Sequence, residues 1–175
     1  MSLLMLGDAV RLTPEGHPNK PSLLTNLGGS FFTRFQQFHD PGDLDAATHQ
    51  FSSAASSDVC STSVQFKASV RWARCAQLSG HHSPLDAYAL SLQLLPQLVW
   101  LGLIPNCYHH LLKAGVMVRD TVAAAIAVQE YLTAIEWLEQ GQSVVWGQLL
   151  QLRSPIHGLR DKHPSLANHL EGLSR

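Results

Sequence analysis

The sequence predicts an all-α protein of stacked antiparallel helical hairpins, an α-solenoid. Apolar residues recur at the three- and four-residue spacing of helices along almost the whole chain. Strand-like alternation is hard to find, and clusters of Gly, Pro and Ser separate the apolar segments at short intervals. These breaks predict eight helices, at residues 2–12, 21–38, 43–56, 63–79, 84–101, 107–127, 130–152 and 155–172.

The breaks between the predicted helices carry recognisable turn signals. Ser83-Pro84 and Ser154-Pro155 each place a capping residue before a proline at the first helical position, so we expect both to begin helices. The other breaks combine Pro, Gly, Asn, His or Ser, which favour turns. They lie at residues 13–18, 40–42, 52–63, 79–82 and 104–106.

Composition limits the class of partner. The 175 residues are enough for one domain with its own core. Twelve Lys and Arg against 13 Asp and Glu leave a formal charge of −1, so we expect binding neither to nucleic acid nor to membranes. Charged residues make up only 14% of the chain and apolar residues 45%, which excludes disorder and predicts apolar surface in contact with another protein.

Cysteine usage and targeting signals favour a cytoplasmic protein. An odd number of cysteines without a C-x-x-C pair predicts neither a disulfide framework nor a zinc site. The three are Cys60, Cys75 and Cys107. The N-terminal apolar run has no preceding positive region, so it does not resemble a secretory signal. The most apolar stretch, 89–104, is too short to span a bilayer.

Small and aromatic residues repeat weakly along the chain. Gly28 and Phe31 on one helix are followed by Ala47, Phe51 and Ala54 on the next, which is the spacing of a tetratricopeptide hairpin. The small residues let two helices approach closely, and the aromatic residues fill the space to the next hairpin. The pattern predicts a tetratricopeptide-like α-solenoid.

The repeats divide the chain into units of one helical-repeat domain, 1–175. Aligning Ala9, Ala54, Leu94 and Gly141 gives steps of 45, 40 and 47 residues, longer than the usual repeat of about 34. The predicted units are a half repeat at 1–18, three repeats at 19–62, 63–104 and 105–153, and a C-terminal helix at 154–175.

Three runs, at 8–55, 63–103 and 134–160, resemble the tetratricopeptide-repeat region of mushroom-type fungal proteins that carry a C-terminal caspase-like peptidase (CHAT) domain. The most specific parts are Pro14-x-Gly16-His17-Pro18 and WLEQGQSVVWGQLL at 137–150. The resemblance implies a helical scaffold that packs against or regulates a peptidase domain. That domain would follow the end of this chain, and its His/Cys dyad has no matching motif here. The chain is then a fragment, a short gene product or a stand-alone adaptor.

A stripe of basic residues indicates a binding function. Lys67, Arg71 and Arg74 recur at steps of four and three and therefore share one helix face. In a tetratricopeptide array the first helices line a concave groove, where arginines would pair with carboxylates of an acidic peptide or a carboxyl terminus. The predicted peptide-binding residues are Lys67, Arg71, Arg74, Lys113 and Arg119, with Asn26 and Arg34 as an extension. Ordinary solvating charges are the alternative.

Other polar patterns favour structural roles. Adjacent histidines, as in His81-His82 and His109-His110, point away from each other, so we predict no metal site. No nucleophile or phosphate-loop motif is present, and we expect no catalytic residue and no cofactor. The four tryptophans are predicted to pack between hairpins. They are Trp72, Trp100, Trp137 and Trp146.

The sequence therefore predicts a non-enzymatic scaffold that binds a protein or peptide. The alternative is a self-assembling protein, because the helix at 2–12 lacks a preceding partner helix. In that case a second copy, which would make the chain a homo-oligomer, or a local rearrangement of the chain would cover its apolar residues. Those residues are Leu3, Leu4, Leu6 and Val10. A hydrolase acting alone is the least favoured interpretation.

Overall fold

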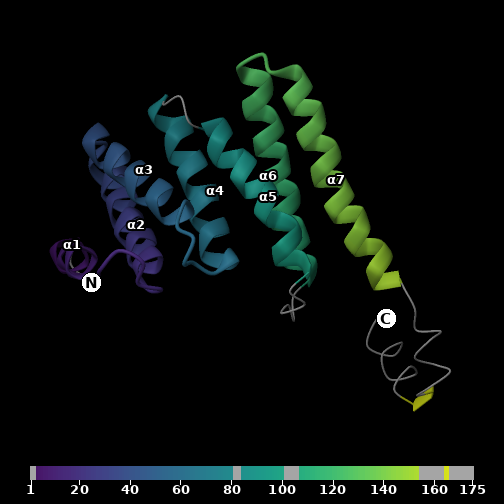
Figure 1. The fold of residues 1–175 in the computed structure, drawn as a ribbon. Coiled ribbons are helices and arrows are strands. Elements are labelled where there is room, and N and C mark those ends of the chain that lie inside the picture. Colours follow the sequence, from purple (N-terminus) through teal and green to yellow (C-terminus); the bar gives the residue numbers. More distant parts are fainter. Residues whose placement is uncertain (1–2, 81–83, 101–106, 154–163, 166–175) are drawn as a thin grey trace.

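The computed structural model describes residues 3–80, 84–100, 107–153 and 164–165, and within them it has seven α-helices and no strand (Figure 1). The helices are α1 (Leu3–Leu12), α2 (Lys20–Phe38), α3 (Pro41–Ala55), α4 (Thr62–Ser79), α5 (Pro84–Trp100), α6 (Cys107–Ala127) and α7 (Tyr131–Arg153). The all-α prediction is confirmed, and the bounds of these seven helices differ from the predicted ones by two residues or fewer. The helix predicted at 155–172 lies outside the described residues except at 164–165.

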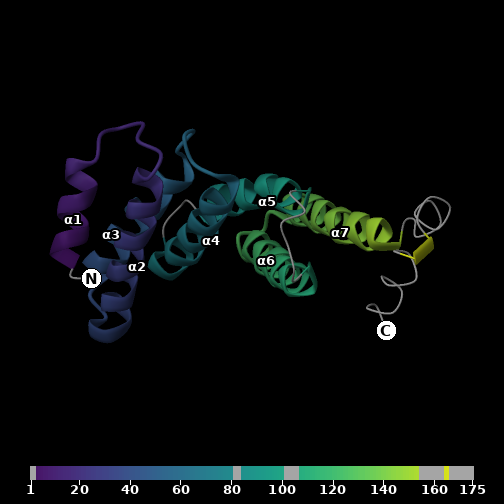
Figure 2. The same cartoon turned by 90° about the horizontal axis from the view of Figure 1, so that it is seen from below.

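Each helix packs against its neighbours in the chain. Contacts join α1 to α2, α2 to α3, α3 to α4, α4 to α5, α5 to α6 and α6 to α7. Further contacts join α2 to α4 and α5 to α7. The two views show the helices following one another in chain order along an elongated row, from α1 at one end to α7 at the other (Figures 1 and 2). Helices α2 and α4 are therefore in direct contact, although α3 separates them in the chain.

Local signals explain the sharp turn from α2 to α3. His39 caps the C-terminus of α2, which ends at Phe38. Its φ of 57° is left-handed, and its N–H donates to the Phe35 carbonyl at 2.7 Å. The Asp40 side chain then accepts a hydrogen bond from the Gly42 N–H at 3.0 Å, which caps α3. Pro41 occupies the first turn, where its missing N–H is not needed. The cap explains why α3 begins two residues before its predicted start.

Two glycines, Gly28 and Gly141, lie in tight contact with a side chain of the neighbouring helix. A Cβ atom on Gly28 of α2 would lie 2.9 Å from Cε1 of Phe51 on α3, and Phe51 is only 1% exposed. A Cβ atom on Gly141 of α7 would lie 2.5 Å from both γ-carbons of Val118 on α6. These distances are shorter than any normal contact between carbon atoms. Both helix pairs therefore require glycine at these seams.

A buried polar pair joins α4 to α5. The Ser91 hydroxyl lies 2.9 Å from the Ser69 hydroxyl and 2.8 Å from the Ala87 carbonyl, and both serines are fully buried. Ser91 lies three residues before Leu94, as Phe51 lies three residues before Ala54, so the weak repeat predicts an aromatic residue at this position. The hydrogen bonds meet the requirement that buried polar groups find partners, so a small hydroxyl replaces the aromatic ring at this seam.

The tryptophans divide into core and surface residues. Trp72 packs against the clusters shared by α3, α4 and α5, and Trp137 packs against those of α5 and α6. Trp146 on α7 is 61% exposed, so its predicted packing role is wrong for the described chain, where no helix covers it. The side chain of Trp100 lies outside the described residues.

The apolar face of α1 is covered only in part. Leu6 is 3% exposed and α1 packs on α2, so the chain itself buries this residue, and the expectation that a second copy covers it was wrong. Leu3 and Val10 are half-buried. Leu4 remains 78% exposed.

Candidate peptide-binding surface

Three basic residues lie on one exposed face of α4. The side chains of Lys67, Arg71 and Arg74 are all exposed, as their spacing predicts. The guanidinium carbon of Arg71 is 5.8 Å from the centre of the Phe51 ring, and that of Arg74 is 5.7 Å from the centre of the Phe32 ring. These cation–π contacts orient both arginines towards α2 and α3 without using their N–H groups. The N–H groups can therefore donate to a partner.

A groove of about 590 Å³ follows one face of α2, and we call it the α2 groove. Its α2 residues recur every three or four positions, whereas α1 and α4 each contribute one residue. The lining residues are Leu3, Asn26, Gly29, Ser30, Thr33, Arg34, Gln37, Phe38 and Arg71. The twelve helical steps from Asn26 to Phe38 correspond to about 18 Å at a rise of 1.5 Å per residue.

The α2 groove brings together three residues that the sequence analysis assigned to one site. Asn26 and Arg34 come from α2, and Arg71 reaches across from α4. A Cβ atom on Gly29 would lie 3.4 Å from one terminal nitrogen of Arg71, so a glycine at this position lets the guanidinium approach the α2 backbone. Lys67 and Arg74 share the exposed face of α4 but do not line the groove.

The charge of Arg34 is compensated within the chain. Its Nε donates to Oδ2 of Asp43 at 2.6 Å, and its second terminal nitrogen pairs with Oδ1 of the same carboxylate. The Asp43 side chain is buried, whereas Arg34 is half-exposed. The hydrogen bonds from Arg34 lower the pKa of Asp43, and they raise the pKa of Arg34 in turn. Arg34 therefore stabilises the α2–α3 hairpin. Because its charge is already paired with Asp43, it attracts an acidic ligand only weakly.

The lowered pKa of Asp43 predicts an acid-sensitive contribution to stability. A carboxyl group with a lowered folded-state pKa stabilises the fold above its unfolded pKa of about 3.9, and the contribution is lost as pH falls through the folded value. We expect Asp43→Asn to be less stable than the parent at pH 7, with the difference shrinking below about pH 4. Urea denaturation at pH 7, 4 and 3 measures this. Asp45→Asn, at an exposed position of the same helix, should show no such convergence.

The structure does not bring Arg119 of α6 to the α2 groove. Among the described residues, the lining of the groove comes from α1, α2 and α4. Arg119 is exposed on α6, and its terminal nitrogen pairs with Oδ1 of Asp120 at 2.9 Å. The side chain of Lys113 lies outside the described residues.

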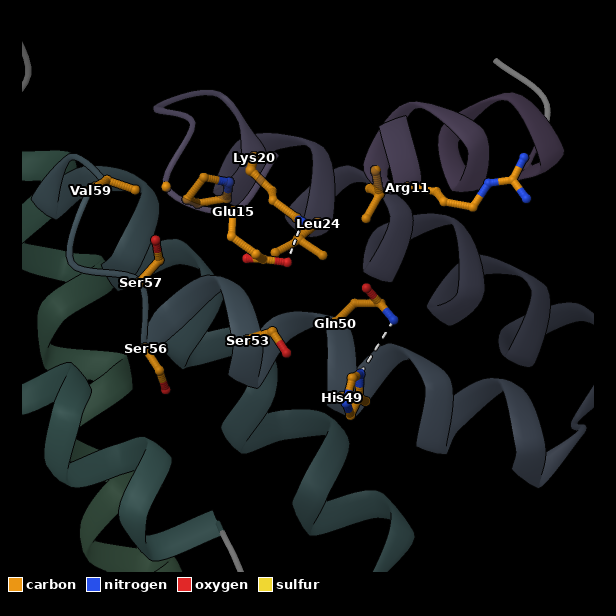
Figure 3. Close-up of a pocket in the computed structure, with 13 residues that line it drawn as sticks. Arg11, Glu15, Lys20, Leu24, His49, Gln50, Ser53, Ser56, Ser57 and Val59 are labelled. Atoms are coloured by element: carbon orange, nitrogen blue, oxygen red, sulfur yellow. Dashed lines mark hydrogen bonds and ion pairs between the residues drawn. The ribbon is translucent and has the colours of Figure 1, made fainter. Parts of the chain in front are cut away.

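A second pocket, also of about 590 Å³, lies between α1 and α3 (Figure 3). We call it the N-terminal pocket. Its polar residues come from the breaks predicted at 13–18 and 52–63 and from the polar faces of α1, α2 and α3. The lining residues are Val10, Arg11, Glu15, Gly16, Lys20, Pro21, Leu24, His49, Gln50, Ser53, Ser56, Ser57 and Val59. The breaks predicted at 13–18 and 52–63 were the signals in the sequence that marked this region.

Other reactive side chains form no site in the described part of the chain. Burial raises the pKa of the Cys75 thiol to about 11, which makes it a poor nucleophile. The described residues include no group of three or more His, Cys, Asp or Glu side chains that could hold a metal ion. The adjacent histidines at 81–82 and the side chains of those at 109–110 lie outside the described residues. None of the described helices combines the length and apolar character needed to cross a membrane.

Comparisons with known proteins identify no relative. The chain matches no family model, no curated protein and no solved structure. The candidate functions below therefore depend on the geometry of the chain itself.

Proposed function

We propose that the chain is a non-enzymatic helical-repeat scaffold that binds an acidic peptide in the α2 groove. The observation that carries the proposal is the position of Arg71, which reaches into a groove whose lining includes two amide and two hydroxyl side chains. No ion pair with Arg71 is formed among the described residues. A guanidinium held in place without a carboxylate partner favours a carboxylate supplied by a ligand.

Helix order supports the repeat part of this proposal. The helices pack in chain order, and glycine lies at the seam of α2 with α3 and again at the seam of α6 with α7. Stacking of hairpins in this way generates an α-solenoid, whose first helices line one surface. In that arrangement α2 and α4 are first helices, and a peptidase domain in a longer relative would be a further partner.

The dimensions of the α2 groove define its ligand. An extended peptide advances about 3.3 Å per residue, so about five or six residues would fill about 18 Å. The amides of Asn26 and Gln37 lie near opposite ends of the groove and can each bond to a peptide backbone. An acidic side chain about one helical turn from the Asn26 end would meet Arg71, which lies beside Gly29. Lys67 and Arg74 would add attraction from the flanking face of α4.

Charge reversal on α4 tests the proposal. The variant Lys67→Glu, Arg71→Glu, Arg74→Glu should bind a fluorescent six-residue peptide rich in Asp and Glu at least about tenfold more weakly than the parent, because charge-assisted hydrogen bonds are lost. Fluorescence anisotropy measures the affinity, and circular dichroism checks that helicity is retained. Binding should also weaken as salt rises.

A matched control distinguishes binding at the α2 groove from attraction of the peptide to any positive charge on the protein. Arg119→Glu reverses an exposed arginine on α6 and should leave the affinity unchanged, because α6 does not line the α2 groove. A peptide in which Asn and Gln replace the acidic residues should not bind. Unchanged binding of the acidic peptide by the triple variant would exclude the α2 groove as its site.

Self-assembly is a second candidate, favoured by apolar side chains exposed at both ends of the row. On α1, Leu4 and Leu12 are 78% and 77% exposed. On α7, Leu132 is 79% exposed and Ile135 is 56% exposed. Because these faces differ, one copy would place α1 against α7 of the next, a head-to-tail contact.

Sedimentation at several protein concentrations tests head-to-tail assembly. The parent chain should increase in mass with concentration, and Leu132→Glu with Ile135→Glu should remain monomeric throughout. Glu at these positions leaves the helix solvated but prevents burial against another copy. A parent chain that stays monomeric at all concentrations would contradict this second candidate.

A further inference from the structure

Lys20 in the N-terminal pocket has an unusual partner. Its side chain is only 14% exposed, yet the Glu15 carboxylate that pairs with its ammonium group is 92% exposed. Glu15 belongs to the connection between α1 and α2, whereas Lys20 is the first residue of α2. Because the Glu15 carboxylate is exposed to water, which screens its charge, its pairing with Lys20 contributes little to stability. A stronger anion entering the pocket can therefore replace Glu15 without disturbing the helices.

Hydrogen-bonding groups surround this ion pair. Figure 3 shows the Glu15 carboxylate between Lys20 above and Ser53 below, with the Gln50 amide to one side. The Gln50 amide nitrogen lies 3.4 Å from Nδ1 of His49, which leaves its carbonyl oxygen to face the pocket. No hydrogen bond within the described chain uses the side-chain hydroxyl of Ser53, Ser56 or Ser57. These groups can bond to a ligand that carries several hydroxyls.

Two further features define what fits. The guanidinium of Arg11 points away from the pocket and pairs with Asp8 at 3.1 Å, so Lys20 is the main cation facing the cavity (Figure 3). Pro21 and Leu24 of α2 add apolar lining. The volume, about 590 Å³, is typical of sites for small organic molecules and much larger than one phosphate ion requires.

We propose that the N-terminal pocket binds a small phosphorylated polyol of the size of a sugar phosphate. The phosphate pairs with Lys20 in place of Glu15, and the hydroxyl groups of the ligand bond to Gln50 and Ser53. This site is separate from the α2 groove, because the two linings share no residue. It gives the scaffold a small-molecule ligand in addition to the peptide proposed above.

Competition between the ligand and Glu15 provides a sharp test. By isothermal titration calorimetry, glucose 6-phosphate should bind the full chain, whereas glucose should not. Glu15→Gln removes the competing carboxylate and should tighten binding about twofold to fivefold. Lys20→Met should weaken it about tenfold or more, because a charge-assisted contact is lost. Arg119→Met, which removes an exposed cation on α6 outside both this pocket and the α2 groove, should have no effect.

A second variant keeps the proposal falsifiable if Lys20→Met does not fold. Ser53 is exposed at the pocket wall, so Ser53→Trp should preserve helicity and block the cavity, abolishing binding of glucose 6-phosphate. The proposal is overturned if glucose 6-phosphate does not bind, if Glu15→Gln weakens its binding, or if inorganic phosphate binds as tightly. A phosphoserine peptide that binds more tightly than glucose 6-phosphate would also overturn it.

Discussion

Replacing Phe51 by alanine should lower the free energy of unfolding by about 3–5 kcal/mol, the usual cost of removing a buried phenylalanine. Phe51 is 1% exposed and lies in a cluster with Leu44, Ala47 and Cys75. The Phe51 ring packs against Gly28 of α2. Because glycine has no side chain, nothing at that position can fill the cavity that Phe51→Ala would leave. Urea denaturation followed by circular dichroism measures the change.

A phenylalanine on the surface provides the control for this substitution. Phe38 is 72% exposed at the end of α2, and Phe38→Ala should change the free energy of unfolding by no more than about 0.5 kcal/mol. Equal, small effects of both substitutions would contradict the packing of α2 on α3. The same comparison bears on the α2 groove, because Phe51 also supports the guanidinium of Arg71. Phe51→Ala should therefore weaken binding of the acidic peptide as well.

Helix positions were predictable because their signals are local. The spacing of apolar residues and the breaks at Pro, Gly and Ser act within a few residues, and the seven described helices follow them closely. Exposure was less predictable, because it depends on which helix covers a given face. Leu6 is buried by α2, whereas Trp146 has no covering helix within the described chain, and neither outcome follows from the residues that flank them.

The candidate site was predictable where its residues lie on one helix, but not where it depends on contacts between helices. The steps between Lys67, Arg71 and Arg74 place them on one helix face whatever the tertiary structure. The Arg34–Asp43 ion pair depends on the angle at which α2 meets α3, so no local pattern of residues indicates that Arg34 is already neutralised. The N-terminal pocket is assembled from α1, α2, α3, the connection between α1 and α2, and the connection between α3 and α4. Such a pocket exists only once those segments are packed together.

Adding one methyl group at Gly141 should also destabilise the protein, by up to about 2.5 kcal/mol in total. In a helix interior, alanine is ordinarily better than glycine by about 0.5–1 kcal/mol. Here the new Cβ atom would lie 2.5 Å from both γ-carbons of Val118, and overpacking of this kind costs about 1–3 kcal/mol. Gly141→Ala should therefore lower the midpoint of urea denaturation.

Two companion variants show whether Val118 is the cause. Gly115 lies in α6, and a methyl group added there would have nothing within 4 Å, so Gly115→Ala should raise stability by about 0.5–1 kcal/mol. Combining Gly141→Ala with Val118→Ala should cost less than the sum of the two single changes, because the methyl group then occupies space that the valine vacates. If Gly141→Ala stabilises the protein as Gly115→Ala does, α6 and α7 are further apart than the structure places them, and the close glycine seam on which the repeat interpretation depends is absent.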